Sequence, residues 1–245
     1  MDQLPYYADD RLLSGCIYCG GPSETRDHVP SRILLNSPYP ENLPVVGACQ
    51  ECNQGFSKDE LYLVCLLEAT IAGSADPDKI RRPSVARAMR MTPALQARID
   101  AARRCIDGNI EFAVEADRIR NVVLKLARGH AAFELSQPCR REPDHLWWCP
   151  MAVMPEEDRD AFGAVHIQET FGEVGSRGLQ RMLVTEVVLP SNTGEKAALR
   201  LLVNDWVDVQ EGYYRYLVID DLGGIVIRIV IAEYLACEVG WRVNG

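Results

Sequence analysis

Residues 16–19 read C-I-Y-C and residues 49–53 read C-Q-E-C-N. A C-x-x-C turn places two thiolates within reach of one ion, and two such turns complete a tetrahedral zinc site with four sulfur ligands. Turn-forming residues flank both pairs, with Gly20-Gly21-Pro22 after the first and Gly47 before the second. The sequence therefore predicts one structural Zn²⁺ that clips residues 20–48 into a closed loop. Its ligands would be Cys16, Cys19, Cys49 and Cys52.

Composition and charge limit the class of protein. The chain has 245 residues, 47% of them apolar, which suffices for one large domain or for a small module joined to a larger one. Its formal net charge of −9 has the wrong sign for a generic nucleic-acid surface. No apolar run approaches the roughly 18–20 residues of a membrane span, and the polar start M-D-Q-L-P-Y-Y-A-D-D is not a secretory signal. Nine cysteines is an odd number, which favours reduced thiols over a disulfide framework. From these features together we expect a cytoplasmic location and no membrane partner.

A second set of polar residues lies within and just after the predicted zinc loop. Asp27-His28 is followed by Pro30, Asn42-Leu43 comes later, and Asn53 directly follows the second cysteine pair. Together these motifs resemble the HNH endonuclease family, whose core is a β-hairpin, a helix and one catalytic metal, bracketed in one branch by two C-x-x-C knuckles. The resemblance covers about residues 14–65.

The resemblance implies a role for each matching residue. Asp27 and Asn53 would ligate the catalytic divalent ion. His28 would be the general base that deprotonates the attacking water, and Asn42 would orient its ring. Oxygen ligands favour Mg²⁺ or Mn²⁺ over Zn²⁺, and an imidazole with a pKa near 6.5 suits the base.

The function implied by this resemblance is metal-dependent hydrolysis of phosphodiester bonds in nucleic acid, with DNA as the expected substrate. A recruiting or inhibiting protein partner would fit so acidic a nuclease. The same four residues can also be ordinary turn, packing, capping and helix-entry residues. Many family members carry a lysine three residues after the last ligand, where this chain has Phe56. The alternative is a catalytically inactive, zinc-stabilised scaffold that binds nucleic acid or protein.

Beyond the zinc loop, the patterns predict helices followed by strands. A capping box at Ser57–Glu60 predicts a helix over about 57–72, and apolar periodicity predicts helices at 94–106 and 117–134. Four β-branched runs, at 181–189, 197–204, 213–219 and 224–231, predict a sheet. The three remaining histidines have no partner pattern and are expected to pack in the core or at its rim. They are His130, His145 and His166.

These elements together predict an α+β protein. Residues 1–73 would form the zinc-clipped ββα-metal module, and residues 94–245 an α+β accessory domain with a mainly antiparallel sheet. Residues 74–93, rich in proline and arginine, would be a basic linker or a strip that contacts nucleic acid, with a solvated helix face as the alternative. The sequence leaves the oligomeric state open.

Overall fold

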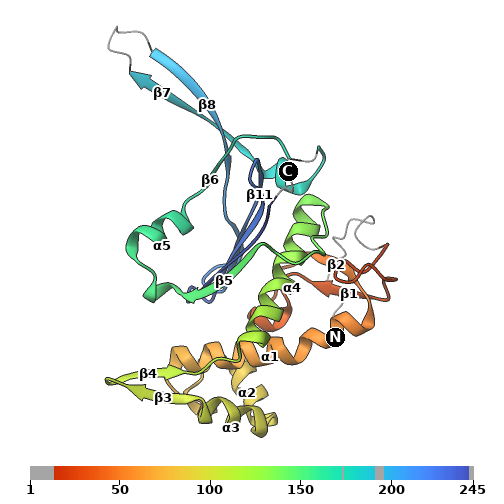
Figure 1. Ribbon diagram of the computed structural model, residues 1–245. Coiled ribbons are helices and arrows are strands. Elements are labelled where there is room, and N and C mark those ends of the chain that lie inside the picture. The colour runs from red at the N-terminus through yellow and green to blue at the C-terminus, as the bar shows by residue number, and fades with distance from the viewer. Residues whose placement is uncertain (1–13, 173, 191–195, 243–245) are drawn as a thin grey trace.

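The computed structural model describes residues 14–172, 174–190 and 196–242, and shows helices combined with antiparallel sheets (Figure 1). The α+β class is thereby confirmed. The helices are α1 (Gln50–Ala72), α2 (Pro83–Met91), α3 (Pro93–Ala101), α4 (Ala116–Leu135), α5 (Glu156–Gly163) and α6 (Arg177–Arg181). Short 3₁₀ turns are η2 (Arg32–Leu34), η3 (Pro77–Lys79) and η4 (Met151–Val153). The strands are β1 (Thr25–His28), β2 (Val45–Ala48), β3 (Arg103–Ile106), β4 (Asn109–Phe112), β5 (His145–Pro150), β6 (His166–Gln168), β7 (Leu183–Pro190), β8 (Lys196–Asn204), β9 (Val207–Gln210), β10 (Tyr214–Asp221), β11 (Gly224–Ile231) and β12 (Leu235–Arg242).

Helix α1 begins seven residues before the position that the sequence predicted, at Gln50 rather than at 57. The reason is local: the Cys49 sulfur caps the helix by accepting a hydrogen bond from the Cys52 amide. Ser57 therefore lies inside the helix, where its hydroxyl donates back to the Asn53 carbonyl, and the predicted capping box is wrong.

Helix α4 lies between α1 and a five-stranded antiparallel sheet of order β5-β12-β11-β10-β9 (Figure 1). Its bounds confirm the helix predicted at 117–134. The largest core cluster joins residues of α1, α4 and the sheet, among them Leu63, Val122 and Ile227. One continuous core therefore runs through both predicted modules, and their division at residues 74–93 stays a prediction.

The predicted helix at 94–106 is only partly confirmed, because α3 ends at Ala101 and a β3–β4 hairpin follows. Asp107 and Gly108 both have positive φ angles, which is the backbone that a tight two-residue hairpin turn requires. All four predicted β-branched runs form strands. Two of them, β7 and β8, make a hairpin that projects from the body of the molecule (Figure 1).

Residues 74–93 form η3 and α2, and one of their arginines is not on the surface. Arg82 is buried, where its guanidinium donates hydrogen bonds to the Asn36 side chain and the Leu35 carbonyl. Arg82 therefore fixes the 33–36 loop and is not available to a basic strip. Arg81, Arg87 and Arg90 are exposed, and the linker or strip at residues 74–93 stays a prediction.

The three histidines outside the zinc loop pack as predicted, in the core or at its rim. His130 is fully buried, stacked on Tyr216 at 3.8 Å between ring centroids. His145 and His166 are half-buried, and each contacts a carboxylate, Glu238 and Asp221 respectively. No helix of the described residues is long and apolar enough to cross a membrane.

Candidate metal centre and hairpin site

The four predicted zinc ligands come together at the start of α1. The sulfur atoms of Cys16, Cys19, Cys49 and Cys52 all lie within 4.8 Å of one another. The Cys19 and Cys49 sulfurs are 3.7 Å apart, close to the edge of about 3.8 Å expected for a tetrahedron with Zn–S bonds of about 2.3 Å. The predicted cluster is confirmed, and its geometry fits a closed site in which four thiolates bind one ion.

Backbone hydrogen bonds lower the pKa of one of these thiols, that of Cys16. Burial opposes ionisation of Cys16, but hydrogen bonds from the backbone of Cys49, Cys19 and Tyr18 outweigh it and lower the pKa of the thiol to about 7. A metal ligand must be a thiolate, so this environment favours the form that binds. Four thiolates would saturate one tetrahedral ion and leave no position for a substrate.

The cysteine cluster holds together a β-hairpin and a helix. β1 pairs antiparallel with β2, with His28 opposite Val45, and α1 begins two residues after β2 ends. Asn53, in the first turns of α1, donates from its side-chain amide to the Thr25 hydroxyl at 3.1 Å. Asn53 therefore joins the helix to β1, and its predicted role as a metal ligand stays a prediction.

Asp27 lies in a buried polar network. Its carboxylate accepts a hydrogen bond from the Tyr18 hydroxyl at 2.6 Å, and its oxygens lie 3.0 and 3.1 Å from the Lys125 ammonium. The same ammonium donates to Ser31 at 2.6 Å and to Glu60. The Lys125 side chain is 1% exposed. Its charge is therefore balanced by two carboxylates rather than by water.

These contacts determine whether the predicted ligands fit a catalytic ion. Both Asp27 oxygens are already engaged and the residue is buried, so the carboxylate as placed does not fit a metal ligand. Within the described part of the chain, the cysteines are the one group of three or more metal-binding side chains that lie close together. Sequence reasoning missed Lys125, whose one signal is a lone lysine in the apolar run V-V-L-K-L-A.

His28 is the last residue of β1 and is half-buried. Burial, together with the nearby Arg32 cation, lowers its pKa to about 4, although a hydrogen bond to the Pro44 carbonyl opposes the shift. The imidazole is therefore neutral at pH 7, but it is a weaker base than the pKa near 6.5 expected from the sequence would make it. The Nδ1 atom of the ring is buried and has no hydrogen-bond partner among the described residues.

Asn42 lies on the loop before β2, exposed, two residues from Pro44. Among the described residues its side chain makes no hydrogen bond, to His28 or to any other residue. The catalytic role of Asn42 stays a prediction. Comparisons with known protein families, curated proteins and solved structures find no match to this chain.

Proposed function

We propose that this chain is an HNH-type endonuclease that hydrolyses phosphodiester bonds in nucleic acid, with DNA as the expected substrate and His28 as the general base. The observation that carries the proposal is the local order of elements: a strand ending in His28, its antiparallel partner, and a helix that starts at a four-cysteine cluster. This is the β-hairpin and helix that the sequence resemblance implies.

In this proposal His28 takes the proton from the water that attacks the phosphorus atom. The ring is neutral at pH 7, the form that accepts a proton. Arg32 is the nearby cation with the largest electrostatic effect on His28. A guanidinium there can offset charge that develops on the phosphate oxygens.

The requirement for Mg²⁺ or Mn²⁺ is a separate part of the proposal. Asp27 and Asn53 would be the ligands, but the Asp27 carboxylate is engaged by Tyr18 and Lys125, so we derive no step through an ion. The same observation favours the second candidate function, a non-catalytic zinc-stabilised scaffold. In that case Asp27 would be a purely structural residue.

Cleavage assays separate the two functions. Plasmid, single-stranded DNA and RNA are incubated with wild-type protein, with His28→Ala and with His145→Ala, each with Mg²⁺, with Mn²⁺ and without added divalent ions. His145 is a matched control, because it is also half-buried but lies on β5. We expect His28→Ala to lower the rate by about 10²–10⁴-fold, the usual worth of a general base, and His145→Ala to leave it unchanged.

Equal cleavage by wild type and His28→Ala would remove His28 from the mechanism. No cleavage of any substrate by wild-type protein with intact zinc content would favour the scaffold.

A further inference from the structure

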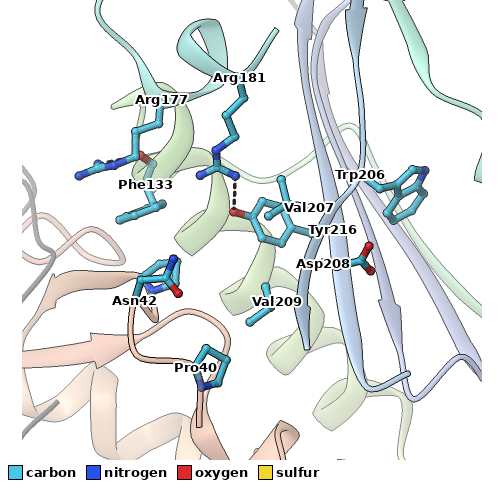
Figure 2. Close-up of a pocket in the computed structure, with 11 residues that line it drawn as sticks. Pro40, Asn42, Phe133, Arg177, Arg181, Trp206, Val207, Asp208, Val209 and Tyr216 are labelled. Carbon is cyan, nitrogen blue, oxygen red and sulfur yellow. Dashed lines mark hydrogen bonds between the residues drawn. The ribbon is translucent and has the colours of Figure 1, made fainter. Parts of the chain in front are cut away.

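A pocket of about 730 Å³ opens beside the hairpin that carries His28. Its walls come from the loop before β2, the end of α4, helix α6 and strands β9 and β10 (Figure 2). Pro44 lines this pocket, and its carbonyl accepts a hydrogen bond at 2.9 Å from the amide of Val29, the residue after His28. Exposed Asn42 lies on the same wall. The loop that lines the pocket is therefore bonded to the end of the strand that carries the proposed base.

Two arginines of α6 give the pocket a positive side in an otherwise acidic protein. Arg181 points into it and is held in place, donating to the Tyr216 hydroxyl at 3.2 Å and to Glu134 at 2.6 Å (Figure 2). Its side chain is still 38% exposed. A guanidinium has five N–H donors, and these two contacts leave others free for a ligand.

Arg177 supplies the net positive charge. Its guanidinium lies 4.1 Å from the centroid of the Phe133 ring and donates to the Phe133 carbonyl. Among the described residues, no carboxylate lies within ion-pair distance of Arg177, whereas Glu134 balances Arg181. The pair therefore carries about one uncompensated charge at the pocket, which suits an anion such as a phosphodiester.

The side of the pocket formed by β9 is apolar. Val207 and Val209 face the interior, whereas the Phe133 ring lies beside Arg177 on the other side (Figure 2). Trp206 and Asp208 also line the pocket, at its edge, but because side chains alternate along a strand, their side chains extend to the other face of β9 (Figure 2). The Asp208 charge is therefore directed away from the two arginines. An apolar wall opposite fixed cations accommodates a planar base joined to a phosphate.

We propose that this pocket binds one unpaired nucleotide of a nucleic-acid strand. Its phosphate would lie between Arg177 and Arg181, and its base would lie against the β9 valines. The proposal rests on the proposed function for its setting, because it makes the pocket the place that holds the strand beside His28. The volume lies within the roughly 300–1,000 Å³ range of ligand sites.

Binding is measured without added divalent ions, so that strand capture is separated from cleavage. The probe is fluorescein-labelled single-stranded DNA of about 16 nucleotides, the upper end of site sizes for small single-strand-binding domains. Arg177→Ala tests the charge and Val209→Trp fills the apolar side. Arg98→Ala is the control, since Arg98 is an exposed arginine in an ion pair on α3, which contributes nothing to the pocket. Melting curves confirm that each variant is folded.

We expect Arg177→Ala and Val209→Trp each to weaken binding by about tenfold, and Arg98→Ala to have no effect. Arg177→Ala should lose one phosphate contact. The plot of log affinity against log salt concentration should therefore become less steep, by about 0.7 in the magnitude of its slope. Wild-type affinity in both pocket variants, or no binding of the probe by wild type, would overturn the proposal. Free dTMP that binds as tightly as the strand would also overturn it, and would assign the pocket to a free nucleotide.

The two proposals fail in different ways. If wild type never cleaves but the pocket variants lose strand binding, the pocket stands and the endonuclease falls. If His28→Ala abolishes cleavage while the pocket variants bind and cleave as wild type does, the endonuclease stands and the pocket falls.

Discussion

Replacing Lys125 by methionine removes the one cation from a buried cluster that contains two carboxylates. The ammonium is 3.0 Å from the nearer Asp27 oxygen and also contacts Glu60, and all three side chains are at most 10% exposed. At an effective dielectric constant of about 20, one such pair at 3.0 Å is worth about 5–6 kcal/mol of attraction. Desolvation of the charges offsets much of this attraction in the folded protein.

Lys125→Met keeps the length and volume of the side chain but leaves two carboxylates buried without a counter-charge. The expected loss is therefore about 3–5 kcal/mol in the free energy of unfolding, the usual cost of breaking a buried pair. The combined variant Lys125→Met, Asp27→Asn, Glu60→Gln is neutral throughout the cluster. It should recover most of that loss.

Equilibrium unfolding in guanidinium chloride at pH 7 measures both variants, with zinc content checked in each sample. Lys58→Met is the control, because Lys58 is an exposed lysine of α1, and it should change stability by less than about 0.5 kcal/mol. A loss below about 1 kcal/mol for Lys125→Met would refute the paired cluster. If the combined variant does not regain stability, the loss in Lys125→Met does not come from the unpaired carboxylate charges.

Three further predictions concern the zinc cluster, a buried histidine and a helix glycine. Protein purified under reducing conditions should carry about one Zn²⁺ per chain by elemental analysis, and Cys49→Ser should lose zinc and cooperative unfolding together, since binding energy at a structural site is folding energy. Burial, with a smaller effect of Arg181, lowers the pKa of His130 from 6.5 to about 3, so the unfolded chain binds a proton that the folded chain excludes. Stability should therefore be complete above about pH 6.5 and fall by about 2 kcal/mol by pH 5 through this group, and unfolding curves of His130→Gln should show a shallower dependence on pH over that window. A β-carbon at Gly129 would lie 2.6 Å from a Val29 methyl. Gly129→Ala should therefore lower the melting temperature, despite the better helix propensity of alanine. An unchanged or higher melting temperature would contradict this close approach of α4 to Val29.

Short-range spacing predicted much of this structure. Two C-x-x-C turns predicted a four-sulfur cluster, and the structure brings those sulfurs together. Apolar periodicity predicted α4 to within one residue at each end, and four β-branched runs became four strands. The helices and strands depend on neighbours a few residues apart, and each cysteine pair is equally local, although the two pairs meet across 30 positions of sequence. The two errors in helix bounds are also local. The helix predicted to start at Ser57 starts earlier because Cys49 caps it, and the helix predicted at 94–106 ends early because Asp107-Gly108 forms a tight turn.

The sequence by itself thus determined the four-cysteine cluster, the main helices and strands, and the residues worth testing as a site. Only the tertiary structure decided the environment of those residues. Lys125 meets Asp27 across 98 positions of sequence, and the pocket brings Asn42 together with Arg177 and Val207. Contacts of this kind arise because α4 and the sheet share one core with α1, and that packing follows from buried shape and volume rather than from any repeat in the chain.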